Sequence, residues 1–277
     1  MSITGEEIRE SVLDVVSAAA SRKTPRQVER AVAARTSAPG RAIRDAIRTL
    51  TSDGTLTYTS LSGTSFLERS FRGSIQVSRR IWLCPGLPKA GRLAWDPAIR
   101  IRILQGAAFG FGDHPTTRLS LRGIDFTLDG RCQDKEAAVD IGTGSGVLAI
   151  AAALLGVERV LAVDIDPCAR TEAAANVAEN GLAGRVSVSD LPLDGLRGPF
   201  SLILANLRPP TLSAMAKEIS KLAAPGARAV FSGFHPEEWA PVEADYRSLG
   251  WQTIWQETEN QWMAAVCARE SWAAGTF

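Results

Sequence analysis

The sequence predicts an α/β protein with a doubly wound, mostly parallel sheet of seven strands, preceded by a small helical domain. Three observations support this prediction. From about residue 137 onward, short apolar runs of strand length alternate with segments of helical periodicity. A glycine-rich turn joins the first of these strands to its helix, and an acidic residue ends the next strand. The first third of the chain instead shows three amphipathic helices and then the alternating pattern of a hairpin.

Composition narrows the class of protein. With 45% hydrophobic and 22% charged residues, the chain has the composition of an ordinary soluble globular protein. Its 31 basic and 30 acidic residues nearly cancel, so the net charge indicates neither a nucleic acid nor a membrane partner. We expect no metal site, no disulfide framework and a reducing cytoplasm, because the cysteines are scattered and form no Cys-x-x-Cys pair. The first residues show no signal segment, and no apolar run is long enough to cross a bilayer. The cysteines are Cys84, Cys132, Cys168 and Cys267.

Residues 1–85 are predicted to form a separate domain, and residues 86–277 form the second one. Apolar residues at helical spacing predict one helix that ends near Ser21, a second that opens at Thr24 and a third after Gly40. Thr24 and Gln27 have the spacing of a capping box. Alternating residues 55–59 and 65–68 around turns predict a hairpin. Three helices followed by a hairpin resemble a winged helix-turn-helix. The prolines of residues 70–98, among them Pro88 and Pro97, suggest a connector, in which residues 74–77 and 80–83 could form strands.

The third helix of this domain carries Arg41, Arg44 and Arg48 on the face opposite its apolar residues. Such arginines would contact phosphates or bases if the domain binds nucleic acid. Alternatively, they form a solvated face on a domain that recognises a protein or forms a homodimer. Asp45 interrupts the arginines and no lysine-rich arm follows, so the sequence favours the second interpretation.

The glycine-rich turn joins the apolar strand predicted over Ala137–Ile141 to a helix over Val147–Leu155. Glycine lets the backbone bend sharply and lets a ligand approach where a Cβ atom would collide, although a tight turn alone can show the same pattern. The next strand, Val160–Val163, ends on Asp164, about twenty residues after the glycines, where nucleotide-binding units place a carboxylate that holds the ribose hydroxyls. The alternative is that Asp164 caps the following helix. The glycines are Gly142, Gly144 and Gly146.

The glycine spacing and the acid before it indicate which nucleotide could bind. Dinucleotide sites use Gly-x-Gly-x-x-Gly and bind a pyrophosphate at the helix N-terminus. Here the spacing is Gly-x-Gly-x-Gly, and Asp140 precedes it. This acid would repel a pyrophosphate but suits a cationic amino group. A ligand with a ribose and an ammonium but no phosphate is S-adenosylmethionine, which is therefore the expected cofactor.

A second glycine-rich segment, Ala108–Leu119, precedes this turn. Its threonines can cap a helix from about Arg118 to Phe126, and its glycines suit a mobile wall over a ligand. The segment reads Ala-Phe-Gly-Phe-Gly-Asp-His-Pro-Thr-Thr and resembles the Ala-Phe-Gly-Thr-Gly-x-His-Pro-Thr-Thr signature of the PrmA-type bacterial ribosomal-protein lysine methyltransferases. The likeness covers about residues 106–269. Its other matches are residues 140–146, 164–167, 175–181, 204–207, Ser232-Gly233 and Trp262.

The resemblance implies the Rossmann-like methyltransferase form of the doubly wound sheet, with seven strands and an antiparallel last pair. It also implies S-adenosylmethionine-dependent methyl transfer to an amine, in particular a protein lysine. The N-terminal domain lies outside the likeness, and the family carries a different small domain there, so the resemblance does not extend to the ribosomal substrate. Helices near 211–222 and 236–249, and strands near 228–232, 251–255 and 263–267, complete the predicted order.

Several further residues are candidates for cofactor contact. Thr117 matches a contact residue of the family, and the alternative is that it caps its own helix. Asp190 ends the strand predicted over Val186–Ser189, where it would reach the adenine amino group or serve as a plain loop acid. The resemblance implies additional contacts by Phe109, Gly110, Thr143 and Ile165, beside Asp140, the three glycines and Asn206.

The candidate catalytic residues are Asn206 and His114. Asn206 ends the strand predicted over Leu202–Ala205, at the sheet edge where ligands collect. The resemblance places it beside the transferred methyl, where its amide would orient an amine, and a plain turn residue is the alternative. His114 is the better candidate base for a lysine with an ordinary pKa of about 10.4, ahead of His235, although ordering of its loop is the favoured role. Arg208 would repel a protonated lysine or hold an anionic substrate.

Two other functions stay open at this point. The first is a small-molecule N- or O-methyltransferase that uses the N-terminal domain for dimerisation. The second is a DNA-binding regulator that senses S-adenosylmethionine. The leading hypothesis is methylation of a protein amine.

Overall fold

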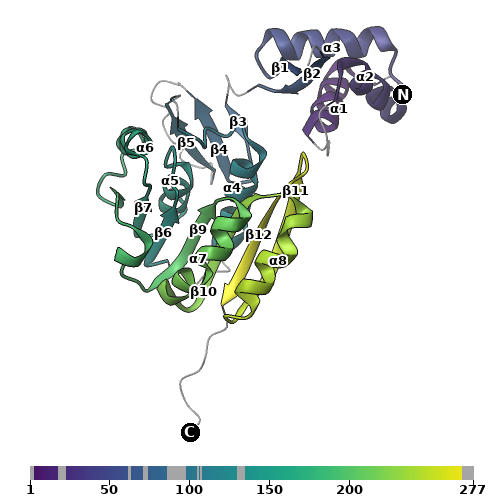
Figure 1. The fold of residues 1–277 in the computed structure, drawn as a ribbon. Helices are drawn as coiled ribbons and strands as arrows, with labels where there is room; N and C mark the ends of the chain where they lie inside the picture. Colours follow the sequence, from purple (N-terminus) through teal and green to yellow (C-terminus); the bar gives the residue numbers. More distant parts are fainter. Residues whose placement is uncertain are drawn as a thin grey trace. The chain divides into compact units, whose positions relative to one another are not determined.

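The computed structural model describes residues 3–17, 23–61, 64–70, 74–85, 98–104, 106, 108–129 and 135–269. The chain divides into two compact units, a smaller one formed by residues 1–73 and 259–261 and a larger one formed by residues 74–258 and 262–277 (Figure 1). Ser21, Pro88, Pro97 and Cys132, which the sequence analysis mentions, lie outside the described residues.

The smaller unit contains three helices and a two-stranded hairpin, in the predicted order. They are α1 (Gly5–Ser17), α2 (Pro25–Thr36), α3 (Gly40–Ser52), β1 (Leu56–Leu61) and β2 (Thr64–Arg69). The two strands pair in antiparallel fashion, and Lys23 forms an isolated antiparallel bridge with Leu67. The capping box at Thr24 and Gln27 is confirmed. The apolar stripes of the helices form the core, which includes Val12, Val32 and Ile43. The helices and hairpin are therefore as expected, whereas a winged helix-turn-helix stays a prediction.

The larger unit is built on a seven-stranded sheet. Its strands are β6 (Ala137–Ile141), β7 (Arg159–Val163), β8 (Val186–Ser189), β9 (Phe200–Asn206), β10 (Ala223–Phe234), β11 (Trp251–Glu259) and β12 (Trp262–Arg269). Their order across the sheet is β11-β12-β10-β9-β6-β7-β8. The pairs from β10 to β8 are parallel, and β12 runs antiparallel to β10. This confirms the predicted doubly wound α/β class.

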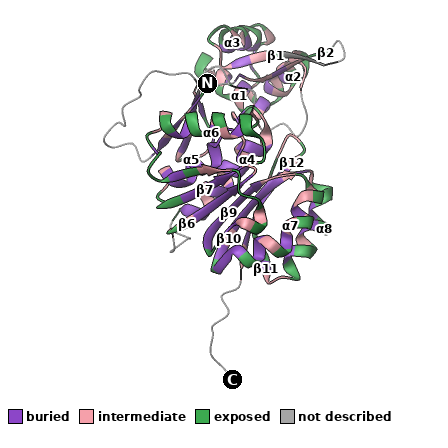
Figure 2. Cartoon of the chain, turned by 60° about the vertical axis from the view of Figure 1, so that its left-hand side comes forward, coloured by how far each residue is buried: buried purple, intermediate pink, exposed green. Residues whose placement is uncertain are grey.

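Helices cover both faces of this sheet, with α4, α5 and α6 on one face and α7 and α8 on the other (Figure 1). The central strands are buried, while the outer sides of the helices are exposed (Figure 2). The helices are α4 (Pro115–Leu128), α5 (Val147–Leu154), α6 (Pro167–Glu179), α7 (Pro209–Leu222) and α8 (Pro236–Arg247). Within the part of the chain that the structure describes, none of the helices combines the length and the apolar character that a bilayer span requires.

A second, three-stranded sheet replaces the expected connector. It consists of β3 (Ile75–Gln76), β4 (Ile81–Pro85) and β5 (Ile99–Ile103). Strand β4 pairs in parallel with β5, and β5 contacts α5 and α6. Because these contacts tie β3 and β4 to the larger unit, the division of the chain lies before Ser74 and not near Pro85.

Candidate functional site

The glycine-rich turn lies at the carboxyl end of β6, as predicted. The backbone N–H groups of Gly142 and Thr143 donate to Val163 O at 2.9 and 3.0 Å, which ties the turn to the end of β7. Gly144 has a φ of +55°, and a Cβ atom there would lie 2.4 Å from Phe109 O. Only glycine fits this position without strain, because both the left-handed conformation and the close backbone approach exclude a side chain.

The second glycine-rich segment, residues 108–119, lies against this turn, and we call it the wall segment. Ser145 N donates to Phe109 O at 2.8 Å, and Ser145 Oγ donates to Gly110 O at 2.9 Å. The structure therefore brings Phe109 and Gly110 together with the glycines, as expected for one site. The Phe109 side chain is more than half exposed and is free to contact a ligand.

The carboxylate of Asp164 is fixed at the end of β7. Its Oδ2 atom accepts a hydrogen bond from Gly144 N at 2.9 Å, and its Oδ1 atom accepts one from Asp166 N at 2.9 Å. The alternative role of Asp164 as a helix cap is wrong, because Asp166 caps α6 by accepting from Cys168 N at 2.8 Å. An ionised carboxylate has about four lone-pair positions, so Asp164 can still accept hydrogen bonds from ligand hydroxyls.

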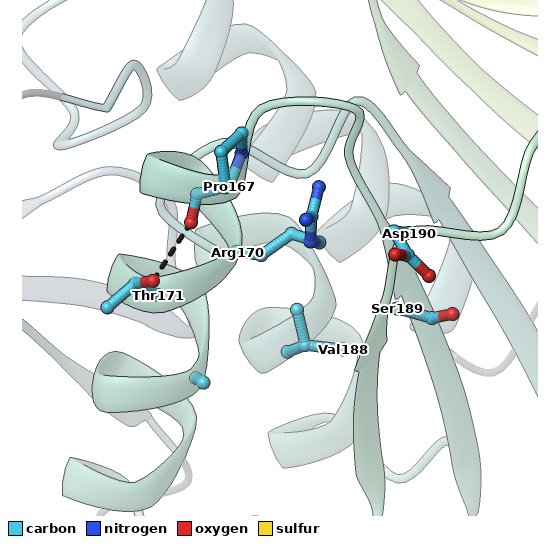
Figure 3. Close-up of a pocket in the computed structure, with 7 residues that line it drawn as sticks. Pro167, Arg170, Thr171, Val188, Ser189 and Asp190 are labelled. Carbon is cyan, nitrogen blue, oxygen red and sulfur yellow. Dashed lines mark hydrogen bonds between the residues drawn. The ribbon is translucent and has the colours of Figure 1, made fainter.

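Arg170 of α6 holds the backbone that follows β7 and carries Asp164. This role was not predicted from the sequence. Its Nη1 atom donates to Asp164 O and to Ile165 O, both at 2.9 Å. The side chain borders an open cavity of about 610 Å³ between α6 and β8, and Asp190 lies on the opposite side (Figure 3). The guanidinium thus fixes the backbone on which the Asp164 carboxylate stands.

Two apolar side chains are exposed at neighbouring strand ends. Ile165, after β7, is 91% exposed, and Leu191, after β8, is 45% exposed. Asp190 stands beside Leu191 and is also exposed. An aromatic base could lie against these apolar side chains with a carboxylate beside it. Leu191 was not predicted from the sequence, although an apolar residue directly after Asp190 is a signal for it.

Asp140 is completely buried below the turn. Its Oδ2 atom accepts hydrogen bonds from Thr143 Oγ1 at 2.6 Å and from Ala149 N at 3.2 Å, while Oδ1 has no hydrogen-bond partner among the described residues. Burial raises the pKa of Asp140 to about 7, against the opposing effect of the two hydrogen bonds. A cation that reached this carboxylate would favour its ionised form.

The first turn of α4 differs from the prediction. The helix begins at Pro115, and its cap is the His114 side chain, whose Nδ1 atom accepts from Thr116 N at 3.3 Å. Both threonines therefore lie inside the helix, and the capping role predicted for them is wrong. Thr117 is 1% exposed, and its hydroxyl has no hydrogen-bond partner among the described residues. The Thr117 hydroxyl and Asp140 Oδ1 are thus two buried oxygens that have no hydrogen-bond partner among the described residues.

Thr116 joins the two predicted catalytic residues. Its hydroxyl accepts from Asn206 Nδ2 at 3.2 Å and lies 2.8 Å from His114 Nδ1. The His114 ring contacts the Phe109 ring with centroids 5.2 Å apart and the Trp262 ring at 4.8 Å, and Trp262 also stacks with His235 at 4.2 Å. The structure thus brings Asn206 and His114 together through a residue that the sequence analysis did not select.

Arg208 lies two residues after Asn206, at the position before the first turn of α7. It is exposed and forms no ion pair among the described residues. Pro209 and Pro210 occupy the first two helical positions and carry no N–H group, so this helix end offers few backbone donors to an anion. The charge at this position therefore comes mainly from the Arg208 side chain.

Three polar side chains, spaced one turn apart along α6 and its C-cap residue, hold the backbone between β5 and the wall segment. Glu172 Oε2 accepts from Ala108 N at 2.9 Å, and Asn176 Oδ1 accepts from Leu104 N at 2.8 Å. Asn176 Nδ2 also donates to Ser145 O in the glycine-rich turn at 2.8 Å. Asn180 pairs with the backbone of β5. These side chains couple the wall segment to the turn.

The described ranges contain no group of three or more His, Cys, Asp or Glu side chains that could hold a metal ion. Cys84, Cys168 and Cys267 are free thiols, and Cys132 is not among the described residues. The groups that the site does offer are a strand-end carboxylate, two exposed apolar side chains, a buried acid and a buried hydroxyl. This set fits a ligand with ribose hydroxyls, a base and an amino-acid end.

Comparisons with known proteins agree with this geometry. The family described as Ribosomal protein L11 methyltransferase (PrmA) matches residues 71–270. Relatives with the name ribosomal protein L11 methyltransferase include one from Myxococcus xanthus, 39% identical over 196 residues, which are 70% of this chain and 65% of that protein. Another, from Pelobacter propionicus, is 36% identical over 196 residues, 70% of this chain and 63% of that protein. The chain thus spans less than two thirds of the length of these relatives.

A solved structure shows the same fold. The crystal structure of the ribosomal protein L11 methylase from Lactobacillus delbrueckii subsp. bulgaricus matches with a TM-score of 0.63 and 28% sequence identity. The match covers 72% of this chain and 99% of that chain. Since the family match takes in every strand of the larger unit and the whole site, the chain belongs to the PrmA family of ribosomal protein L11 methyltransferases.

Proposed function

We propose that the chain is an S-adenosylmethionine-dependent methyltransferase that transfers a methyl group to an amine, in particular the side chain of a protein lysine. Membership of the PrmA family supports this reaction. The observation that carries the proposal is the Asp164 carboxylate, which is held by Gly144 N at the carboxyl end of a parallel strand. This is the place and the chemical group that a ribose requires.

The cofactor supplies an electrophilic methyl group on its sulfonium, and the residues of this chain bind and orient it. Asp164 accepts hydrogen bonds from the ribose hydroxyls. Ile165 and Leu191 would contact the adenine, and Asp190 would accept a hydrogen bond from its amino group. The unsatisfied oxygens of Asp140 and Thr117 serve the amino-acid end, where an ammonium compensates the buried carboxylate.

On the acceptor side, Asn206 positions the amine. Its Nδ2 atom donates to Thr116, which leaves Oδ1 to accept a hydrogen bond from the incoming N–H group. The backbone N–H of Thr116 donates to His114 Nδ1, so this nitrogen carries no proton and can also accept from the Thr116 hydroxyl. His114 then carries its proton on Nε2 and has no lone pair for a lysine proton. We therefore assign His114 to ordering of the wall, and the lysine loses its proton to water.

A second candidate acceptor is an anionic small molecule. The exposed guanidinium of Arg208 favours it, because a fixed positive charge two residues from Asn206 repels a protonated lysine. A ribosomal-protein acceptor would place the reaction in the cytoplasm. The helices and hairpin of the smaller unit lie outside the family match. The identity of the acceptor protein is therefore a part of this proposal.

Two measurements test the proposal. Calorimetry of the full chain with S-adenosylhomocysteine should detect binding that Asp164→Ala weakens by about a hundredfold, since two charged hydrogen bonds are lost. Isotope-labelled S-adenosylmethionine, incubated with the chain and a cell lysate, should label protein that yields methyl-lysine on hydrolysis. Absence of binding heat overturns the cofactor assignment. Label that appears only in small metabolites overturns the protein acceptor.

A further inference from the structure

We propose that the smaller unit binds nucleic acid through a basic surface on α2 and α3. We call this surface the α2–α3 basic surface. It consists of Arg26, Arg30, Arg41, Arg44 and Arg48. The inference concerns a part of the chain outside the family match and does not depend on the proposed methyl transfer.

Charge is segregated between the helices of this unit. Helix α1 carries four acids and a single arginine, whereas α2 and α3 together carry six arginines and only Glu29 and Asp45. The near-zero net charge of the whole chain hides this difference. Clusters of arginine along helices are the electrostatic feature by which proteins attract phosphate backbones.

The arginines are exposed and mostly uncompensated. All five arginines of the surface are exposed. Arg44 pairs with Glu29, and Arg48 pairs with Asp45, in ion pairs of low strength because they are open to solvent. The three remaining arginines of the surface make no hydrogen bond or ion pair among the described residues. Because a guanidinium fork matches phosphate oxygens in geometry, these side chains are available for phosphate contacts.

The three arginines of α3 share one side of the unit with Arg26 and Arg30 of α2, whereas Arg35 lies on the opposite face of α2 from Arg26. Arg41, Arg44 and Arg48 have i, i+3, i+7 spacing, so they line one face of α3, and its buried residues line another. Arg26 and Arg30 are one turn apart on α2, away from buried Val28 and Val32. The Arg44–Glu29 ion pair joins the helices on this side.

The connection between the helices keeps this arrangement compact. Only three residues, Ser37 to Pro39, separate α2 from α3. Ser37 ends α2 in the left-handed conformation with a φ of 56°, and buried Ala38 anchors the turn in the core. Two helices joined by such a short turn are the elements of a helix-turn-helix motif, whose second helix enters the major groove of a duplex.

Nucleic acid explains this surface better than a second copy of the chain does. In a two-fold dimer the surface would face itself, and its arginines would repel one another. Pairing of the surface with the acidic α1 of another copy is heterologous and would have to close into a ring or form chains. Duplex DNA and duplex RNA offer the same phosphate chemistry, and both enter the test.

The test uses the full chain and fluorescence anisotropy with a labelled duplex of about 20 base pairs, as DNA and as RNA, across roughly 50 to 200 mM KCl. The test variant is Arg26→Gln/Arg30→Gln/Arg41→Gln. The matched control is Glu6→Gln/Glu10→Gln/Asp14→Asn, which neutralises the same number of charges on α1. Thermal unfolding of each variant checks the fold, and binding of S-adenosylhomocysteine checks the larger unit.

We expect wild-type chain to bind at least one duplex, with an affinity that falls steeply with salt. The arginine variant should bind at least tenfold more weakly, with a salt slope reduced by about 2 to 3, because each lost phosphate contact removes about 0.9 from it. The control should bind as tightly as wild type or more tightly. No binding to either duplex at low salt, or an unchanged slope in the arginine variant, overturns the proposal. Salt-sensitive self-association in sedimentation that both variants abolish, without duplex binding, also overturns it.

Discussion

The two sides of the candidate site are held in different ways. On the cofactor side, at the ends of β6, β7 and β8, backbone hydrogen bonds fix Asp164, the glycine-rich turn and the wall segment to one another. On the acceptor side, at the end of β9, Asn206 is held by one hydrogen bond to a threonine, and Trp262 is held by ring contacts. The proposed cofactor side is therefore preformed, whereas the proposed acceptor side leaves polar groups for a substrate.

This difference indicates that cofactor binding and acceptor choice are separable. A change on the cofactor side should alter the affinity for S-adenosylhomocysteine, because the residues act through a shared rigid backbone. A change on the acceptor side should alter turnover and leave that affinity intact. Substitutions on each side test this separation.

The largest effect is expected for Gly144→Ala. Its Cβ atom would lie 2.4 Å from Phe109 O in a residue with a φ of +55°. Left-handed strain and overpacking should together lower the free energy of unfolding by about 3 kcal/mol or more. Since the turn must move, affinity for S-adenosylhomocysteine should fall by at least about a hundredfold. Urea denaturation and calorimetry measure the two effects.

Gly181→Ala is the matched control for this change. Gly181 also has a positive φ, +71°, but nothing lies within 4 Å of the position that a Cβ atom would occupy there. Only the conformational strain remains, so stability should fall by about 1 kcal/mol, and affinity should not change. Equal losses of affinity in both variants would contradict a requirement for close approach at Gly144.

The second effect is expected for Asn206→Ala. Loss of the amide removes the group that orients the amine, so turnover should fall by about a hundredfold. Affinity for S-adenosylhomocysteine should stay within about twofold, as single-turnover kinetics and calorimetry can show. Ser201→Ala, at the opposite end of β9, removes a hydroxyl that donates to Ala137 O and serves as the control. If Asn206→Ala weakened cofactor binding as much as turnover, the two sides would not be separable.

Prediction from the sequence succeeded where chemistry follows a strand end. The strands over Ala137–Ile141 and Val186–Ser189 have the expected bounds, and Asp164 and Asn206 lie at the same edge of the sheet, because parallel strands end together. Strand β5 was missed, although its isoleucines alternate with arginines. The nearby prolines favoured a connector, and the parallel partner that stabilises β5 is not visible in a local pattern.

The missed site residues share a physical reason. Thr116 matters only because folding brings Asn206 to it across 90 positions of sequence. Arg170 donates to backbone carbonyls, which every residue has, so no sequence pattern marks its partners. His114 caps α4 with an imidazole nitrogen, whereas the usual caps are hydroxyls and carboxylates, and this favoured the threonines.

A smaller effect is expected for the pH dependence of stability, through Asp140. The unfolded chain ionises this group near its ordinary pKa of 3.8, and the folded chain does so near 7. Between these values the folded state holds the additional proton, so the free energy of unfolding should fall as the pH rises from about 4 to about 7 and then level off. Asp140→Asn lacks this decline, so above pH 7 it should be more stable than wild type. Parallel stability curves for the two proteins across this range would contradict the raised pKa.

The smallest effect is expected for Arg170→Ala, which tests whether the cofactor side depends on a residue outside the ligand-contacting set. Loss of the hydrogen bonds to Asp164 O and Ile165 O should loosen the turn and weaken S-adenosylhomocysteine binding by about tenfold. Because the side chain borders an open cavity of about 610 Å³, guanidinium ion at about 10 mM should enter and restore part of the affinity, whereas methylammonium should not. Arg185→Ala is the control, since Arg185 donates to Val157 O before the opposite end of β7. It should lower stability without a change in affinity. An equal loss of affinity in both variants would show that general loosening of the sheet, and not the turn that carries Asp164, sets cofactor binding.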